Sequence, residues 1–518
     1  MPTTKRLALI TGATSGIGLA TVRLLGRRGH TVFLGARNAE DVDTRAIAPG
    51  GPAGAGNRTW ALLGVLAGNM LIDALEVSTL VVAAPTVGRA LGLPPAGLQW
   101  LLTGFALGFA GLLLLGPRLA ARWGRRRVYL GGLAVFAAAS LLAGVTQDPG
   151  VLVATRFVKG CCAALTAPMG LAIILGAFPD GPARRRAISV YTFFGACGFS
   201  AGLLLSGALT GWNWHWTLAF PAPIVLVLLL AGARLIPGPA RGSGGPAPPL
   251  DLAGAAALTG TLVALVTGLA AVPGHGWTGP RTFLPLGAAV LLGVLLVAVE
   301  RAAAQPLLRA SLCGNGALAR SALGAASLNG SYLGLLLVVT VQLQDRLHWS
   351  PFGTALAMLP ASAPLALTAL RSAAVVARFG ARPLIALGAL AAFAGELLLL
   401  RQGLPTRYAS GLLPTVLLLG AAFVLAFTAL NTQAVSGFPD GEKAAAGATY
   451  QTAVQAGAAV VPALVALVLP TGPVGAATAG AYRPAEALVA GVGLLGLVAA
   501  AGGLRSTRPG GRGGGGTG

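Results

Sequence analysis

Two closely spaced pairs of ionisable residues lie inside long apolar stretches of this chain, where a buried charge is costly and usually serves function. Asp73 and Glu76 are three positions apart, which places both carboxyl groups on one face of a helix. Arg156 and Lys159 have the same spacing in a second stretch. A carboxyl group in an apolar cavity holds its proton tightly, and a nearby arginine loosens that hold, so Asp73, Glu76 and Arg156 could bind and release protons. The alternative is a fixed ion pair that only neutralises buried charges.

Other polar and aromatic side chains in the apolar stretches could bind a ligand or only pack. Lys159 could accept an anionic substrate or fill space, and both interpretations stay open. Glu396 lies near the end of its stretch, where we expect its carboxyl group to reach the water interface rather than to carry protons. Seven side chains could line a cavity for an apolar compound, although Gln342 could equally bond between helices. These seven are Phe105, Phe109, Phe193, Phe194, Trp216, Tyr332 and Gln342.

The composition identifies lipid as the main solvent of the chain. Hydrophobic residues make up 55% of its 518 positions and charged residues 10%, and the mean hydropathy is +0.78. A soluble domain carries about 25% charged residues. A chain this poor in charge cannot cover a water-facing surface, so its surface must face a bilayer.

The net charge of +22 raises the question of nucleic-acid binding, and the positions of the basic residues argue against it. They stand in short clusters between apolar blocks instead of on one solvated face. The cysteines have no histidine partners at metal-ligand spacing, so we expect neither a metal site nor a disulfide framework. They are Cys161, Cys162, Cys197 and Cys313.

Apolar blocks recur from Trp60 onward, each about 18–25 residues long and able to span a hydrocarbon core. They predict an all-α polytopic membrane protein with about fourteen transmembrane helices. The predicted spans are 60–84, 98–117, 128–146, 151–176, 187–210, 216–236, 252–272, 283–300, 319–342, 353–372, 382–401, 410–431, 446–469 and 484–503.

Arginine clusters in alternate loops predict the orientation of these helices. One set of loops holds the clusters, such as 125–127 and 184–186, and the other holds only scattered charges. Basic loops face the cytoplasm, so an even number of spans places both termini there, in a multi-pass protein of the plasma (inner cell) membrane. Glu76 and Arg156 then lie at similar depth in the outer half of the bilayer. Moving Arg156 as the bundle rocks would switch proton binding.

The expected domain order is two six-helix halves around an inserted pair of helices. Similar basic, glycine-centred turns at 121–126 and 377–382 favour such a repeat, which is common in secondary transporters. The expected segments are a β-α-β fragment at 1–46, a linker at 47–59, the first half at 60–236, the central loops with the inserted pair at 237–318, the second half at 319–503 and a disordered tail at 504–518.

Four stretches carry recognisable motifs: an acidic motif around Glu76, a basic loop at 116–127, an arginine motif at 156–160 and a glycine-rich run at 195–207. Together they resemble the fourteen-helix drug:proton antiporter branch of the major facilitator superfamily, the EmrB/QacA-like group, over residues 60–503. The resemblance implies a loop that changes conformation at Gly116, Arg118, Arg122, Gly124, Arg125 and Arg126. It also implies an antiporter helix marked by Gly195, Gly198, Gly202 and Gly207.

Three positions depart from that family's pattern. Ala121 stands where the loop has an aspartate, Pro117 stands at its leading glycine, and Ala201 with Gly202 replaces a Gly-Pro pair. The family uses these positions for conformational switching and for limiting leak. Their loss opens the alternative of a degenerate membrane protein that does not transport.

The first 46 residues follow a different pattern from the rest of the chain. Strand-like runs at 7–10 and 31–34 flank a helical pattern, with glycines where a backbone approaches a phosphate. This fragment resembles the start of a short-chain dehydrogenase or polyketide ketoreductase. That likeness implies a vestigial cofactor site at Gly12, Gly16, Gly18 and Arg37. The family's catalytic Tyr-x-x-x-Lys is missing and about forty residues cannot bury a parallel sheet, so we expect no enzyme and no bound NADP.

The resemblance to the antiporters implies an exporter that exchanges protons for a hydrophobic small molecule by alternating access, with the substrate near the bilayer midplane. The ketoreductase-like start points to an antibiotic or polyketide as cargo. We expect a monomer whose partners are the substrate, protons and lipid. An importer, a non-transporting protein and a membrane-anchored NADP-binding remnant stay as alternatives.

Overall fold

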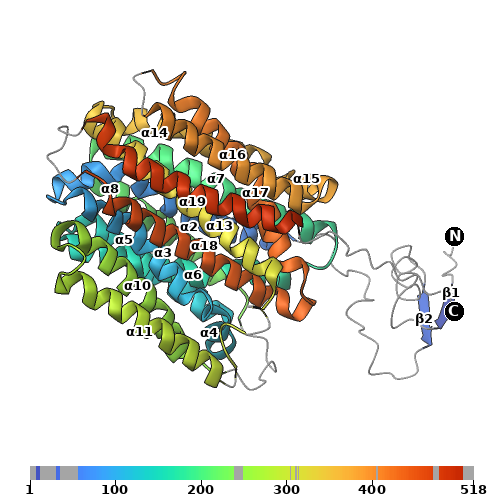
Figure 1. The fold of residues 1–518 in the computed structure, drawn as a ribbon. Coiled ribbons are helices and arrows are strands. Elements are labelled where there is room, and N and C mark those ends of the chain that lie inside the picture. The colour runs from blue at the N-terminus through green and yellow to red at the C-terminus, as the bar shows by residue number, and fades with distance from the viewer. Residues whose placement is uncertain are drawn as a thin grey trace, which may run out of the picture.

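The computed structural model describes a helical bundle and a pair of short strands (Figure 1). Helices dominate because a bilayer offers no partner for backbone N–H and C=O groups, and a helix satisfies these groups internally. The described residues are 7–11, 31–35, 56–238, 249–303, 305–309, 312, 314–403, 407–470 and 478–505.

Eight helices make up the first part of the bundle. They are α2 (Asn57–Ala90), α3 (Pro95–Leu113), α4 (Gly116–Trp123), α5 (Arg125–Val145), α6 (Pro149–Ala177), α7 (Pro182–Trp212), α8 (Trp214–Ala219) and α9 (Pro221–Leu235). Side chains cap two of these helices, α6 and α8; at α6, the Asp148 carboxylate accepts a hydrogen bond of 2.9 Å from the Val151 N–H.

The remaining helices make up the rest of the bundle. They are α10 (Leu252–His275), α11 (Pro280–Ala302), α13 (Gly316–Val341) with the π-helical turn η3 (Gln342–Arg346), α14 (Pro351–Thr368), α15 (Ser372–Phe379), α16 (Ala381–Gln402), α17 (Leu412–Ser436), α18 (Asp440–Leu467), the 3₁₀ turn η4 (Ala479–Tyr482) and α19 (Arg483–Arg505). Each of the fourteen predicted spans overlaps one of the helices in the described part of the chain.

The number of membrane crossings depends on two bent helix pairs. Within the described residues, 12 helices are long and apolar enough to cross a membrane, or up to 14 if each bent pair is one span. The second membrane helix ends at Leu113 instead of the predicted 117, and a 56° bend leads into α4. Pro117 contributes to this break because it has no N–H to continue the ladder. The tenth predicted span ends at Thr368 instead of 372, and a 76° bend leads into α15.

The two bent pairs end in matching turns, which supports the internal repeat. α4 ends at Gly124 with φ of 86°, and α15 ends at Gly380 with φ of 80°. Both values lie in the left-handed region that favours glycine. Figure 1 places α4 and α15 at the same end of the bundle and α8 at the opposite end.

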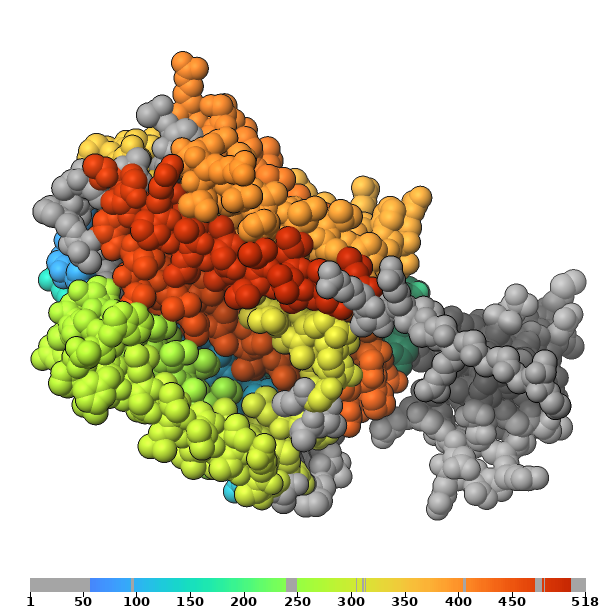
Figure 2. Space-filling model, viewed as in Figure 1, coloured from blue at the N-terminus to red at the C-terminus, as the bar shows by residue number. Residues whose placement is uncertain are grey.

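The first half packs mainly through the pairs α2–α7 and α3–α6, and the second half through α13–α18 and α16–α17. Contacts between the halves run through α3–α18 and α7–α14. Of the inserted pair, α10 packs against α3 and α18, while α11 packs against α10 at one edge of the molecule (Figure 2). Large apolar side chains of α11 are exposed there, including Val290, Leu291 and Val294, as expected for a lipid-facing helix.

The N-terminal region contains two short strands. β1 (Leu7–Thr11) and β2 (Thr31–Gly35) pair in parallel, with Leu7 opposite Thr31. A parallel pair needs a crossover connection, as the predicted β-α-β fragment would have. The segment between the strands lies outside the described residues, and so do the expected cofactor residues Gly12, Gly16, Gly18 and Arg37.

Candidate functional site

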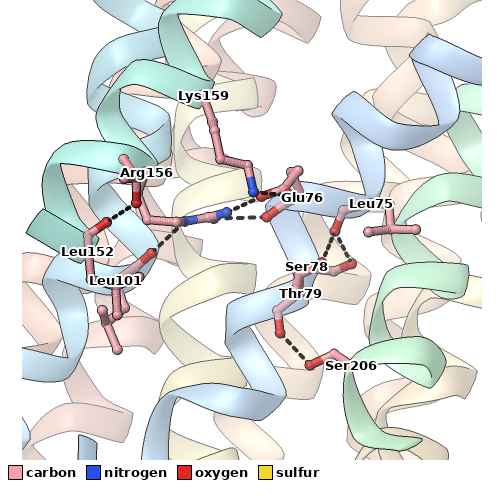
Figure 3. Close-up of polar contacts among 10 residues, drawn as sticks. Leu75, Glu76, Ser78, Thr79, Leu101, Leu152, Arg156, Lys159 and Ser206 are labelled. Carbon is pink, nitrogen blue, oxygen red and sulfur yellow. Dashed lines mark hydrogen bonds and ion pairs between the residues drawn. The ribbon is translucent and has the colours of Figure 1, made fainter. Parts of the chain in front are cut away.

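Glu76, Arg156 and Lys159 form one buried ion cluster (Figure 3). The Arg156 guanidinium pairs with Glu76 Oε2, and Lys159 Nζ lies 2.5 Å from Glu76 Oε1. All three side chains are at most 1% exposed. Because water cannot reach the cluster, the two cations and the carboxylate depend on one another for stabilisation.

Arg156 ties three helices together. It donates from Nη2 to the Glu76 carbonyl oxygen of α2 at 2.9 Å and from Nε to the Leu101 carbonyl oxygen of α3 at 3.1 Å. The guanidinium carbon also lies 5.2 Å from the centre of the Phe105 ring, and Lys159 Nζ lies 5.1 Å from that of Phe136. Aromatic faces attract cations, so these rings stabilise the charges further.

Asp73 adjoins the cluster without an ion pair of its own in the described part of the chain. Its Oδ2 accepts hydrogen bonds from Asn69 at 2.9 Å and from Thr166 at 3.0 Å, while Oδ1 has no partner there. With both carboxyl groups ionised, Asp73 and Glu76 balance Arg156 and Lys159, so the four charges sum to zero. A proton on either carboxyl group would leave one uncompensated positive charge.

The structure bears on two expectations about this cluster. Lys159 was left open between substrate binding and packing, but it is a direct ion partner of Glu76. Arg156 was expected to move away from Glu76 as the bundle rocks. Glu76, Arg156 and Lys159 all lie in the first half, on α2 and α6, so rocking of one half against the other would not separate them. Any switch must act inside that half.

Glu396 does not lie where the sequence predicted. Its side chain does not reach the water interface but is 1% exposed, and its carboxyl oxygens have no hydrogen-bond partner among the described residues. α16 continues six residues past Glu396, which keeps the carboxyl group inside the bundle against α19.

The seven side chains predicted to line a cavity do not come together. Phe105 and Phe109 are buried in a cluster with Leu113 and residues of α6, and Phe193 packs edge-on against Phe194 on α7. Tyr332 of α13 packs between Phe199 of α7 and Phe423 of α17. Gln342 donates a hydrogen bond of 3.0 Å to Glu486 Oε1 of α19. This contact agrees with the alternative interpretation, in which Gln342 bonds between helices.

Trp216 is exposed at the surface of the bundle. Its side chain is 54% exposed on α8 and stacks on Trp212, which is 80% exposed. Figure 1 places α8 at the end of the bundle away from α4 and α15. Exposed tryptophans at a bundle end are typical of the membrane interface, where the amphipathic ring sits among lipid head groups.

The basic loop motif forms α4 and the start of α5. Arg118 donates to the carbonyl oxygens of Gln305 at 2.7 Å and Pro306 at 2.8 Å, which follow α11. Arg126 donates to the Ala233 carbonyl oxygen of α9 at 2.6 Å. These bonds fasten the loop to neighbouring helix ends. The other motif residues placed there are Gly116, Arg122, Gly124 and Arg125, with Ala121 exposed beside them.

The glycines of α7 mark its closest helix contacts. A Cβ on Gly195, Gly198 or Gly202 would collide with α2, at Met70, Leu71 or Leu75 respectively. A Cβ on Gly207 would lie 2.7 Å from Ala355 of α14, in the other half. The glycine-rich helix therefore lies directly between α2, which carries Glu76, and the second half.

Contacts between the halves close the end of the bundle away from α4 and α15. Gln344 Nε2 donates to the Val82 carbonyl oxygen at 2.8 Å, and Arg89 lies 3.9 Å from Asp345. The Ser200 and Ser362 hydroxyl groups meet at 2.9 Å farther along the same interface.

The fold and the buried charges together define a polytopic helical membrane transporter. Residues 66–462 match the model of the Major Facilitator Superfamily, and the chain belongs to this family. It is accordingly a multi-pass membrane transporter and not an enzyme.

Curated relatives and solved structures agree with this family. The chain is 36% identical to the puromycin resistance protein of Streptomyces alboniger over 79% of this chain and 81% of that protein. It is 34% identical to the cephamycin export protein of Amycolatopsis lactamdurans, over 61% of this chain and 65% of that protein. A crystal structure of a peptide transporter in complex with sulfate has the same fold, with a TM-score of 0.63 at 16% identity, covering 86% of this chain and 94% of that one.

Proposed function

We propose that this transporter exports a hydrophobic small molecule, such as an antibiotic, in exchange for protons. The observation that carries the proposal is the buried, charge-balanced group of Asp73, Glu76, Arg156 and Lys159. Charges inside membrane helices are rare and mark ion or proton pathways. The names of two relatives, a puromycin resistance protein and a cephamycin export protein, support an antibiotic as the cargo.

In the proposed mechanism, proton binding changes the net charge of this group. A proton on Asp73 or Glu76 leaves Arg156 and Lys159 with one charge in excess, which favours rearrangement of α2 against α6. α7 packs on α2 through its glycines and on α14 through Gly207, so it could pass that rearrangement to the second half. The closed end away from the arginine-rich loops supports a state facing the cytoplasm, as alternating access requires.

The finer details belong to the same proposal. We assign the chain to the fourteen-helix antiporter branch, with each bent pair as one span and α10–α11 as the inserted pair. We place both termini in the cytoplasm, because the arginine clusters lie at the end that carries α4 and α15. We also propose that the protein is a monomer in the plasma membrane.

The test is substrate-induced proton movement in inverted membrane vesicles, with puromycin and a cephamycin as probes. We expect a probe to dissipate the pH gradient in wild-type vesicles and Glu76→Gln to lower that response at least tenfold. Asp440→Asn is the matched control, because Asp440 is 96% exposed and should be dispensable. Folded, inserted wild-type protein that moves no protons with any probe would favour the non-transporting alternative that Ala121 and Ala201 raise.

For residues 1–46 we propose a remnant of a dehydrogenase-like fold with no cofactor. The parallel pairing of β1 and β2 supports the fold, while the missing Tyr-x-x-x-Lys argues against chemistry. Fluorescence titration of the full chain with NADPH should give no saturable binding. Saturable binding that is lost when Arg37 is replaced by Ala would favour the NADP-binding alternative instead.

A further inference from the structure

Another buried acidic residue lies in the second half of the transporter, far in the sequence from the cluster around Glu76. Glu396 of α16 is 1% exposed, and no Lys, Arg or His in the described part of the chain forms an ion pair with it. Within the described residues, neither carboxyl oxygen has a hydrogen-bond partner of standard geometry, and the nearest donor is the hydroxyl group of Ser331. An ionised carboxylate in such a place would have nothing to replace the water that it lost.

The helices around Glu396 supply no charge to balance it. The carboxyl group lies against Gly493 of α19, where a Cβ would collide with its oxygen, and near Ser331 of α13. α17 has no titratable side chain. The titratable groups of the other packed helices are Arg320 and Tyr332 on α13, Arg378 on α15, Arg483, Glu486 and Arg505 on α19, and Arg382 and Arg401 on α16 itself.

These groups are too distant or turned away. At 1.5 Å per residue, Arg320 lies roughly 16 Å along α13 from Ser331, and Glu486 and Arg483 lie roughly 10 and 15 Å along α19 from Gly493. Tyr332 faces Phe199 and Phe423, and Arg401 is exposed at the end of its helix. The backbone of Arg382 and Arg505 lies about 18 Å or more along α16 and α19 from this level, and Arg378 precedes the start of α16.

A small cavity lies beside this carboxyl group. It has a volume of about 20 Å³ and is lined by residues of α13, α16, α17 and α19, including Ser331, Ala392 and Gly493. That is room for one water molecule. Ser331 and Gly493 also border the Glu396 carboxyl group, so the cavity and the carboxyl group are neighbours.

We propose that Glu396 is a proton-binding site of the second half, which holds its proton in the conformation described here and releases it when the neighbouring cavity opens to water. Proton binding by Glu396 is independent of the proposed function, and its use in coupling rests on that function. Exchange of protons for substrate would then involve one carboxyl group in each half. The charge of Glu76 is neutralised by two cations, and Glu396 is neutral because it carries a proton.

Infrared difference spectroscopy of the purified full chain in lipid, without substrate, tests the proposal. At neutral pH, we expect the carbonyl stretch of a protonated carboxylic acid in the wild type, with part of this band lost in Glu396→Gln and retained in Asp440→Asn, whose carboxylate is 96% exposed. A wild-type spectrum equal to that of Glu396→Gln in this region would overturn the proposal. Failure of the vesicle assay would leave this result untouched, so the two proposals can fail separately.

A second variant covers the case in which Glu396→Gln does not fold. Ser331→Ala removes the hydroxyl group nearest the carboxyl group without changing a charge, and the carbonyl frequency of an acid depends on such neighbours. We expect the band to shift in Ser331→Ala but not in Ser140→Ala, whose buried hydroxyl group lies on α5 of the first half. An unshifted band in Ser331→Ala would count against Glu396 as its source.

Discussion

The two halves of the transporter bury acidic side chains in opposite ways. In the first half, Glu76 contacts two cations and Asp73 accepts two hydrogen bonds, so the buried charges balance. In the second half, Glu396 is equally buried, but no cation pairs with it in the described residues and only the Ser331 hydroxyl group lies near its carboxyl group. The halves repeat each other in backbone, down to the glycine turns after α4 and α15, yet not in electrostatics.

This contrast teaches that burial alone does not reveal the state of a carboxyl group. Glu76 is stabilised as an anion by Arg156 and Lys159, so removing the carboxylate takes the ion-pair partner from both cations and leaves one positive charge uncompensated. Glu396 has no such partners, so a neutral replacement should leave nothing unpaired. Neutralising each residue separately therefore distinguishes the two halves.

The largest effect should come from Glu76→Gln. Loss of the carboxylate leaves Arg156 and Lys159 without their ion-pair partner, and breaking a buried pair by removing one partner costs about 3–5 kcal/mol. We expect the free energy of unfolding to fall by about that amount. The thermal unfolding midpoint of the purified protein in detergent measures the change.

A double variant separates lost charge balance from lost packing. Adding Lys159→Met to Glu76→Gln removes one stranded cation, so part of the loss in thermal midpoint should be recovered. If Glu76→Gln unfolds at the wild-type temperature, or if Lys159→Met makes it worse, the cluster is not held together by charge balance and the contrast between the halves disappears.

An intermediate effect, equal in both halves, should follow from replacing the turn glycines. Gly124 and Gly380 have φ of 86° and 80°, and forcing a Cβ into this backbone conformation costs of order 1–3 kcal/mol. Gly124→Ala and Gly380→Ala should therefore lower the thermal midpoint by similar amounts. Gly131→Ala is the control, because Gly131 has room for a Cβ within α5 and a helical alanine is favourable. Unequal losses would mean that the backbone repeat is only approximate.

Much of the fold could be predicted from the sequence because lipid imposes a simple rule on it. Apolar blocks of spanning length must become helices, and the i, i+3 spacing of Arg156 and Lys159 matches that of Asp73 and Glu76. Helix rise then placed Glu76 and Arg156 at one depth, and the structure brings them into contact. The position of Lys159, three residues after Arg156, also indicated a partner for the acidic pair. From the sequence alone, its role stayed open between substrate binding and packing.

Residues whose role depends on helix rotation could not be placed in this way. Whether Glu396 faces lipid, water or a neighbour depends on α19, which offers Gly493 at the point of contact. Trp216 was expected inside, but the short α8 turns it outward. No pattern local to either residue reveals the orientation of a helix about its axis, because both neighbouring faces are apolar.

The smallest effect should come from Glu396→Gln. If the carboxyl group carries a proton, the amide replaces a neutral group of nearly the same shape, and shape-conserving core substitutions usually change stability by less than about 1.5 kcal/mol. The thermal midpoint should therefore stay close to that of the wild type and of the exposed control Asp440→Asn. A loss as large as that of Glu76→Gln would mean that Glu396 is an anion with a cationic partner. Both halves would then neutralise their buried acids in the same way, and the proton site proposed for the second half would fall.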